Sequence, residues 1–365
     1  MLVGICDSRT SLLPGIASVR KQIRVVSGNK DLQGVRVLLT GASGLLGHNV
    51  LRTLLERGCK VRAVVRKSGA IRSEAIPEGT EVLLETILGD ILDFNNLEQW
   101  CQGCDAVINC AGTTDMSLLR LEDYLPVNCS LPEAICAVME RNPALRTLVS
   151  VSSANTVGNG SPQSPADESA PFAPPYSASL YGQSKAEAEA WLRRWAGSHT
   201  DKRVIIVNPG FIIGAYDYKP SSGQLLLAAY RKPLMAAPPG GKSFVYASDA
   251  AVAIVNALSR GRSGETYLLT GKCLSLKEFY KLQAQLLRYR QLYISLPRRL
   301  CVLVGALGDL LRKLGVRTML SRANVELMCE REHYDNSKAV RELGLPQTPL
   351  EDAVIAFWNS WLSRK

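Results

Sequence analysis

The chain has 365 residues, a length that exceeds one compact core and predicts one large α/β domain with a smaller appended part. Hydrophobic residues make up 46% of the chain and charged residues 21%, which excludes a largely disordered protein. The net charge of +10 comes from scattered lysines and arginines, so it predicts a basic surface and no nucleic-acid partner.

The cysteines follow no repeating framework and are typical of reduced thiols in a cytoplasmic protein. Cys101 and Cys104 form a CxxC motif without a second pair or nearby histidines, so we expect no metal. A redox pair competes there with a helix end that leads into a buried strand. No integral membrane span is expected, because residues 300–320, the nearest candidate, contain charged residues. They predict an amphipathic helix, packed on the body or on a membrane face.

Residues 1–33 precede any clear strand pattern and are treated as an N-terminal extension; they do not resemble a signal peptide. From residue 34, short apolar runs alternate with helical patterns, which is typical of βαβ units and a parallel sheet. We expect strands at residues 35–39, 60–66, 80–84, 106–110, 145–150 and 204–207, and helices at 45–57, 97–101, 132–141 and 178–196. A Rossmann-type, doubly wound α/β fold is the natural closure.

The alternation of strands and helices lapses after residue 209. Residues 210–242 are rich in Gly and Pro, and residues 274–365 are mainly helical. We therefore place an NAD(P)-binding Rossmann core at 34–209 and a smaller, mainly helical substrate-binding region at 210–365, interleaved with the last strands of the core. Tyr216, Tyr218 and Lys219 are candidates for lining the substrate pocket, with a mobile lid as the alternative.

A TGxxGxxG motif lies between the first predicted strand and the first predicted helix, the context that a dinucleotide-binding fingerprint requires. Gly41 permits the tight turn, Gly44 lets the backbone approach the pyrophosphate, and Gly47 lets the helix lie close on the sheet. The free N–H groups of the helix would bind the phosphates. The predicted contacts are Thr40, Gly41, Ser43, Gly44, Leu45, Leu46 and Gly47.

The end of the second predicted strand indicates which dinucleotide is bound. A carboxylate there would bind the ribose 2′-hydroxyl of NAD. The strand instead ends in Arg66 and Lys67, and no carboxylate lies between Glu56 and Glu74. A guanidinium at Arg66 suits a 2′-phosphate and can stack on adenine, which favours NADP, with NAD as the alternative.

Tyr181 and Lys185 are four residues apart in a predicted helix, so the phenol and the ammonium project from the same face. Ser152 and Ser153 end a predicted strand upstream. A free phenol, with a pKa of about 10, is a poor base at neutral pH, and an adjacent ammonium would stabilise its phenolate. Such a lowered pKa would make Tyr181 a usable proton relay.

Together with the glycine-rich loop, these residues resemble the extended short-chain dehydrogenase/reductase superfamily over Val35 to about Leu362. Within it, the chain is most similar to the dihydroflavonol reductase-like branch of the NAD-dependent epimerase/dehydratase family. The supporting segments fall in the family's order: GDILD at 89–93, INCAG at 108–112, VSSANTVG at 151–158, NPG at 208–210 and FVYASDAA at 244–251.

The resemblance implies an NAD(P)-dependent oxidoreductase that reduces a carbonyl, or oxidises an alcohol, of a small organic substrate. Tyr181 would be the general acid or base, Lys185 would lower its pKa and hold the nicotinamide ribose, and Ser153, preferred to Ser152, would bond the substrate oxygen. Tyr181 and Lys185 would thus also contact the cofactor. The further cofactor contacts that the resemblance implies are Asp90, Ile91, Ala111, Gly112, Asn128 and Pro209.

Some positions depart from the pattern of sugar-modifying relatives. Val157 stands where many of them carry Tyr, and Asn208 stands where they carry Arg. Asn208-Pro209 is similar to the reductase branch, so we expect a substrate other than a nucleotide sugar. A nucleotide-sugar epimerase or dehydratase that retains NAD is the alternative, and a non-catalytic nucleotide-binding scaffold is a third possibility. A homodimer is compatible with the sequence.

Overall fold

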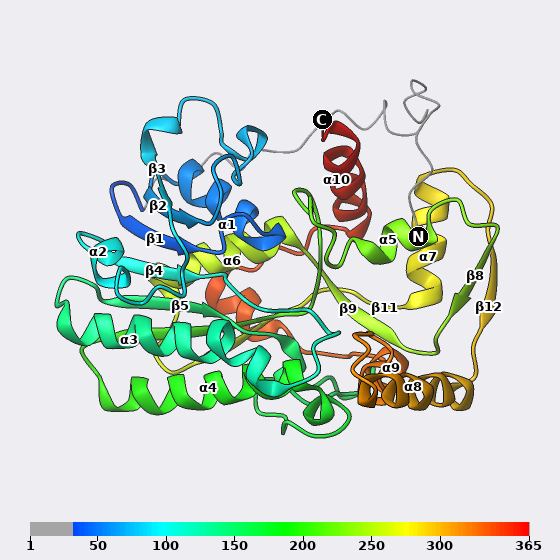
Figure 1. Cartoon of the computed structure of the whole chain (residues 1–365). Helices are drawn as coiled ribbons and strands as arrows, with labels where there is room; N and C mark the ends of the chain where they lie inside the picture. Colours follow the sequence, from blue (N-terminus) through cyan, green and yellow to red (C-terminus); the bar gives the residue numbers. More distant parts are fainter. Residues whose placement is uncertain (1–31, 365) are drawn as a thin grey trace.

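The computed structural model describes residues 32–364, so nearly all of the expected N-terminal extension lies outside the described residues (Figure 1). A seven-stranded sheet forms the centre, in the order β10-β6-β5-β4-β1-β2-β3. All neighbouring strands in it are parallel. The strand order reverses between β1 and β4, which confirms the predicted Rossmann-type fold. The strands are β1 Arg36–Thr40, β2 Lys60–Val65, β3 Leu84–Leu88, β4 Ala106–Asn109, β5 Thr147–Val151, β6 Arg203–Pro209 and β10 Thr266–Leu269.

Helices cover both faces of the central sheet, which is why its inner strands are nearly continuous apolar runs. One face carries α1 (Leu45–Glu56) and α6 (Ala247–Arg260), and their apolar side chains share a core with Val37 and Ile108. The other face carries α2 (Leu97–Cys101), α3 (Leu131–Arg141) and α4 (Leu180–Ser198). Figure 1 shows α3 and α4 side by side beneath the sheet.

The third predicted strand, at residues 80–84, is wrong. Residues Glu81–Leu83 form a 3-10 turn, and β3 begins at Leu84, where the prediction ends. The structure pairs Val61 with Leu84 and Val65 with Leu88. Because β3 is the edge strand and is largely exposed, it mixes polar Glu85 and Thr86 with apolar residues, so hydrophobicity alone did not mark it.

The CxxC motif forms a helix end and a turn before β4. Cys101 ends α2, and the Cys104 thiol donates a hydrogen bond to the Trp100 carbonyl (3.7 Å). Both are free thiols. Burial raises the pKa of Cys101 to about 12 and that of Cys104 to about 11, which keeps both as unreactive thiols. These contacts favour the structural interpretation over a redox pair.

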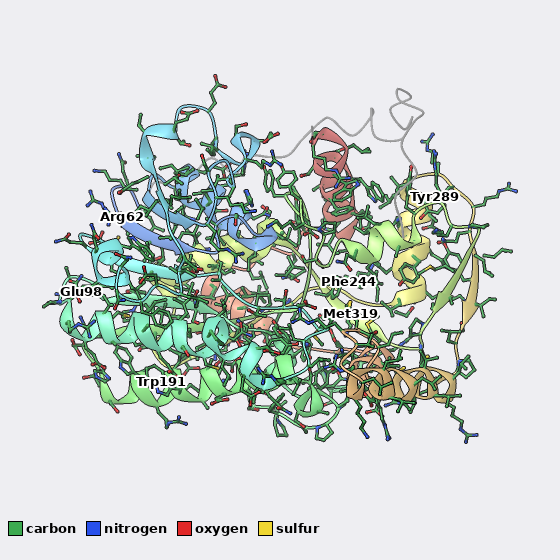
Figure 2. The ribbon with its side chains drawn as sticks, viewed as in Figure 1. Arg62, Glu98, Trp191, Phe244, Tyr289 and Met319 are labelled. Carbon is green, nitrogen blue, oxygen red and sulfur yellow. The ribbon has the colours of Figure 1, made fainter. Side chains whose placement is uncertain are left out.

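The rest of the chain packs around a separate apolar core that includes Phe244, Phe279, Phe357 and Trp358. Phe244 stacks on Phe279 with ring centres 4.2 Å apart. Figure 2 labels Phe244 in this part of the chain. Two small sheets, β11-β9-β7 and β12-β8, accompany the helices expected there. The elements are β7 Phe211–Ile213, α5 Gln224–Ala229, β8 Leu234–Ala237, β9 Gly241–Tyr246, β11 Cys273–Ser275, α7 Leu276–Leu286, β12 Leu292–Ser295, α8 Arg298–Lys313, α9 Arg322–Cys329 and α10 Leu350–Ser363.

The chain enters this second part after β6 and returns to the central sheet through α6 and β10 before leaving it again. The two parts are therefore interleaved in sequence. Within residues 32–364, no helix is long and apolar enough to cross a membrane.

Candidate active site

The glycine-rich loop joins β1 to α1 at the point where the strand order reverses. Gly41 has a φ of 69°, and a Cβ atom there would lie 2.6 Å from the Ala111 backbone nitrogen. A Cβ atom on Gly47 would lie 2.0 Å from the Gly41 carbonyl oxygen. The close approach at Gly47 is thus to the loop itself, and not to the sheet as the sequence suggested. Both positions exclude any side chain.

Gly44 differs from its two neighbours in the motif. A Cβ atom there would lie 3.4 Å from the Gly41 oxygen, an ordinary contact, so the packing of the protein alone does not require glycine. Gly44 begins α1 without a side-chain cap, which leaves the first N–H groups of the helix directed out of the loop. Ser43 and Gly44 are exposed, and Leu45 and Leu46 are half-buried. This geometry matches an anion site built from backbone groups.

The ends of β1 and β4 are tied together beside this loop. Thr40 Oγ1 donates to Asn109 Oδ1 (2.6 Å), and the Ala111 N–H donates to Thr40 Oγ1 (3.3 Å). Thr40 therefore fixes the two strand ends relative to each other at the switch point with this pair of hydrogen bonds. Ligands of doubly wound sheets bind in this crevice.

Arg66 and Asp90 lie at the same edge of the sheet as the loop. Arg66 follows the last residue of β2 and is exposed, and the Gly89 N–H donates to the Val65 carbonyl (3.0 Å), which aligns the two strand ends. Asp90 Oδ1 accepts from the Leu92 N–H (3.1 Å), and Ile91 packs on the core. A basic side chain and a carboxylate thus flank the region where an adenosine would lie.

Ser153, Tyr181 and Lys185 come together next to the β4 end. The Ser179 side chain caps α4 by accepting a hydrogen bond from the Gly182 N–H (3.4 Å), which places Tyr181 in the first turn and Lys185 one turn later. The Tyr181 hydroxyl faces the Ser153 side chain. Lys185 Nζ donates to the Val151 carbonyl (3.0 Å).

Gly112 and Asn128 adjoin this cluster. A Cβ atom on Gly112 would lie 3.3 Å from Lys185 Nζ and 3.6 Å from Asn128 Oδ1. Asn128 accepts from the Thr113 N–H (2.9 Å) and donates to Ser184 Oγ (2.9 Å). Asn128 therefore orders the strand-end loop and α4 directly. Pro209, at the end of β6, is the next predicted cofactor contact along the sheet edge.

The structure separates the two candidate serines. Ser152 is committed to a buried contact, because its hydroxyl donates to Glu189 Oε1 (2.5 Å). Ser153 Oγ accepts only a long hydrogen bond from the Asn155 N–H (3.2 Å) and faces Tyr181. The geometry thus favours Ser153 as the substrate-facing hydroxyl.

Burial dominates the charge states of the cluster. It raises the pKa of Tyr181, and the hydrogen bond from Ser153 offsets part of this rise. Burial lowers the pKa of Lys185 to about 8, against the opposing charge of Glu189. In this geometry burial outweighs the expected lowering of the Tyr181 pKa by Lys185, whose ammonium is directed at a backbone carbonyl.

Glu189, which the sequence analysis missed, organises a buried network behind the cluster. Its Oε1 accepts from Ser152 Oγ (2.5 Å), Thr156 Oγ1 (2.7 Å) and Asn208 Nδ2 (2.9 Å). Its Oε2 pairs with the Arg193 guanidinium (2.6 Å). The available signal was its position, one helical turn after Lys185 on the same face of α4.

A cavity of about 160 Å³ opens beside Tyr181. Tyr124 and Leu118 line it from the Rossmann core, and α8 and α9 close its other side. Arg312 of α8 donates to the Leu118 carbonyl (2.5 Å), and Asn324 donates to the Met116 carbonyl (2.9 Å). The second part of the chain thereby holds the loop over Tyr181, a contribution that the sequence did not predict.

Tyr216 and Tyr218, expected near the substrate, lie instead beside the start of α1. Tyr216 stacks on His48 with ring centres 5.8 Å apart, and its hydroxyl donates to the Glu74 carbonyl (3.1 Å). The Arg72 guanidinium lies 5.3 Å from the centre of the Tyr218 ring. Lys219 is exposed. These residues do not line the Tyr181 cavity.

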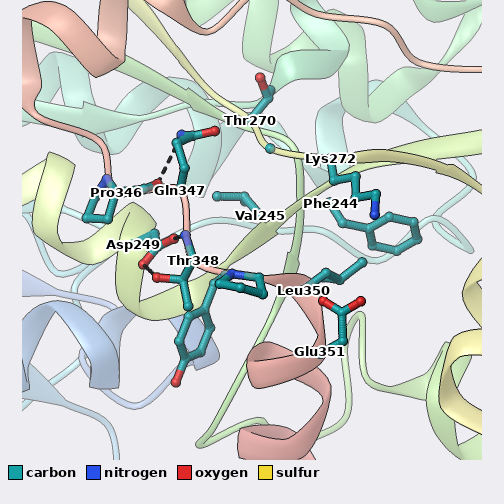
Figure 3. Close-up of a pocket in the computed structure, with 13 residues that line it drawn as sticks. Phe244, Val245, Asp249, Thr270, Lys272, Pro346, Gln347, Thr348, Leu350 and Glu351 are labelled. Carbon is teal, nitrogen blue, oxygen red and sulfur yellow. Dashed lines mark hydrogen bonds between the residues drawn. The ribbon is translucent and has the colours of Figure 1, made fainter. Parts of the chain in front are cut away.

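A second cavity, of about 200 Å³, lies between β9 and the start of α10 (Figure 3). Asp249 at its edge accepts hydrogen bonds from the Thr348 N–H and hydroxyl (both 2.8 Å). Its lining contains none of the predicted catalytic or cofactor residues. The Tyr181 cavity, which is lined by one of them, is therefore the candidate active site.

The sheet order, together with the uncapped glycine-rich loop at the switch point, defines the class of α/β enzymes that bind a dinucleotide. The sequence profile of the NAD dependent epimerase/dehydratase family matches residues 37–269, and the chain belongs to this family. It is an extended short-chain dehydrogenase/reductase, and thus an NAD(P)-dependent oxidoreductase.

Among its relatives is the sterol demethylase protein B of Methylococcus capsulatus, which is 29% identical over 85% of this chain and 93% of the relative. A protein of Synechocystis sp. named "Putative dihydroflavonol 4-reductase" is 29% identical over 87% of this chain and 91% of its own length. The crystal structure of gox2253 superimposes with a TM-score of 0.74 and 26% identity, over 89% of this chain and 97% of that one.

Proposed function

We propose that the chain interconverts a carbonyl and an alcohol on an apolar organic substrate with NADP(H). The observation that carries this proposal is the meeting of Ser153, Tyr181 and Lys185 at the dinucleotide edge of the sheet, beside a cavity. A hydroxyl donor, a phenol and an ammonium in one buried cluster can bind a carbonyl oxygen and deliver a proton to it.

The residues fit the cofactor on two observations. The start of α1 is uncapped and free of side chains at Gly44, and Gly112 keeps the space beside Lys185 clear. Gly41 to Gly47 would hold the pyrophosphate, and Tyr181, Lys185 and Pro209 would hold the nicotinamide half. The bound dinucleotide supplies the hydride.

The side chains of this chain perform the proton chemistry. Ser153 donates to the substrate oxygen and fixes it next to the Tyr181 hydroxyl, which faces the Ser153 side chain. Tyr181 gives its proton to that oxygen as negative charge develops there. Lys185, held by the Val151 carbonyl, stabilises the resulting phenolate.

Two observations support an apolar substrate other than a nucleotide sugar. The names of the two relatives refer to a sterol and to a dihydroflavonol. Asn208, which stands where sugar-modifying relatives carry Arg, is fully buried and bonded to Thr156 and Glu189, so it presents no charge to a substrate phosphate.

A carbonyl panel monitored through NADPH absorbance tests the proposal. We expect turnover on apolar ketones and a loss of about 10²- to 10⁴-fold in Tyr181→Phe, because the proton donor is removed. Tyr293→Phe, on the remote strand β12, is the matched control and should keep full activity. A purified protein that retains NAD stoichiometrically and does not oxidise NADPH with any ketone would instead indicate an epimerase.

A further inference from the structure

Helix α8 presents a narrow side to the protein and a wide apolar side to solvent. Of its residues it buries Cys301, Gly305 and Gly308. A Cβ atom on Gly305 would lie 2.8 Å from the Arg322 Cα, and one on Gly308 would lie within van der Waals overlap of Leu320. The two glycines therefore seat α8 directly on the backbone that leads into α9, and its large side chains point elsewhere.

These large side chains form one continuous strip, which we call the leucine face: Leu300, Leu303, Leu307, Leu310, Leu311 and Leu314. Their three- and four-residue spacing aligns them on one side of a helix. Leu303 is 58% exposed, Leu307 57% and Leu314 73%. No element within residues 32–364 covers them. Proteins rarely expose so many large apolar side chains together unless the surface binds something apolar.

Positive charge borders the leucine face. Helical geometry places Arg299 and Lys313 along one of its edges, and Arg317 follows its end; all three are exposed. The acidic residue of α8, Asp309, points away from the face and accepts a hydrogen bond from the Arg322 N–H (3.2 Å). The surface therefore combines an apolar strip with a basic edge, in which Arg317 lies near the carboxylate of Asp115.

We propose that the leucine face docks on a bilayer that carries anionic lipids. The leucines would enter the boundary with the acyl chains, and Arg299, Lys313 and Arg317 would bind phosphate or carboxylate head groups. At residues Arg298–Lys313 the helix is too short to span a bilayer and would lie in the plane of its surface.

The charge pattern favours a bilayer over a second copy of this chain. Two copies that met through antiparallel leucine faces would place Arg299 of each beside Lys313 of the other. This arrangement juxtaposes like charges, which is unfavourable. A bilayer with anionic lipids can contact the leucine face through its acyl chains and the basic edge through its head groups.

Docking of α8 on a bilayer would also affect the Tyr181 cavity, because α8 forms part of its wall. Arg312 and Asn324, on α8 and α9, form the wall of the Tyr181 cavity, and Figure 1 shows both helices together at one end of the molecule. Docking would hold this wall against the acyl region, where an apolar substrate is dissolved. This last step rests on the proposed function, whereas the docking itself does not.

Flotation of the full chain with phosphatidylcholine vesicles, with and without phosphatidylserine, tests the proposal. We expect binding to the vesicles with phosphatidylserine that weakens as salt is added. The double variant Leu303→Glu/Leu307→Glu should bind at least about tenfold more weakly. Arg299→Gln/Lys313→Gln should weaken binding and reduce its salt dependence. Val82→Glu, at a residue 92% exposed on the Rossmann core, is the matched control and should bind like the wild type.

Two further measurements keep the outcome decisive. Thermal unfolding should be unchanged in the leucine variants, because these side chains lack partners within the described residues. Tyr181→Phe should bind vesicles fully, which separates docking from catalysis. Wild-type protein that does not float with phosphatidylserine vesicles, or a double variant that floats equally well, overturns the proposal. A wild-type dimer that the double variant dissociates would assign the face to a second copy and overturns it as well.

Discussion

At the residue scale, the buried carboxylate of Glu189 lies behind the proposed catalytic cluster and favours the charged form of Lys185 against the effect of burial. Glu189→Gln keeps an oxygen for Ser152, Thr156 and Asn208 but removes the charge that favours the Lys185 ammonium. We therefore expect the Lys185 pKa to fall below its value of about 8, so that activity declines at lower pH than in the wild type.

The expected shift of the pH profile is toward lower pH because the ammonium is the active form of Lys185, and this form is lost as the pH rises through the Lys185 pKa. The measurement is a pH profile of kcat, with Glu187→Gln, an exposed position on the same helix, as the control. Weaker hydrogen bonds to a neutral amide should also cost about 1–3 kcal/mol of unfolding free energy. A profile that does not move, with stability reduced, would show that Glu189 acts on the fold alone.

Arg66 gives a second prediction at this scale, on the choice of cofactor. Arg66→Ala should weaken NADPH binding by about ten- to a hundredfold, since a charge-assisted contact to a 2′-phosphate is lost. NADH binding should change little, and the ratio of the two dissociation constants is the quantity to measure by fluorescence titration. Arg146→Ala, on a separate strand end, serves as the control. Equal losses for both dinucleotides would remove the case for NADP.

At the scale of elements, two glycines of the loop between β1 and α1 allow effects on protein stability to be distinguished from effects on cofactor binding. Gly47→Ala forces a Cβ atom to 2.0 Å from the Gly41 oxygen, so α1 must shift away from the loop. We expect a loss of about 1–3 kcal/mol in unfolding free energy together with weaker cofactor binding.

Gly44→Ala is the matched variant, because its Cβ atom meets only an ordinary contact at 3.4 Å. Its unfolding temperature should equal that of the wild type while its affinity for the dinucleotide falls, since the methyl group occupies the approach to the helix N–H groups. Thermal unfolding without cofactor and a binding titration distinguish the two effects. Wild-type affinity in Gly44→Ala would contradict the assignment of this loop.

The sequence predicted the elements whose apolar pattern reflects burial on both sides. The strands β1, β4, β5 and β6 and the helices α1, α3 and α4 lie within a few residues of their predicted bounds. The edge strand β3 was misplaced because its pairing depends on backbone hydrogen bonds and not on burial. The short strands β8 and β12 pair across a long sequence separation, which no local pattern encodes.

The residues of the candidate site likewise fall into those that local motifs predicted and those that only the folded structure relates to the site. Motif spacing was sufficient to predict that Ser153, Tyr181 and Lys185 lie near one another beside the glycine-rich loop, and their catalytic roles stay a prediction. Asn208 and Arg312 reach the site from elements distant in sequence, so only the folded chain relates them to it. The preference for Ser153 over Ser152 has a physical reason in the structure, because the Ser152 hydroxyl is bonded to Glu189.

At the scale of the whole molecule, the return of α6 and β10 to the central sheet makes the two parts inseparable. A chain that ended after β6 would leave that strand with an open row of N–H and C=O groups, and α1 would lose the helix that packs on it. Such a fragment would invite pairing with other chains. The second part of the chain therefore cannot be exchanged as an independent domain, because the central sheet is completed only by β10, which follows much of that part in the sequence.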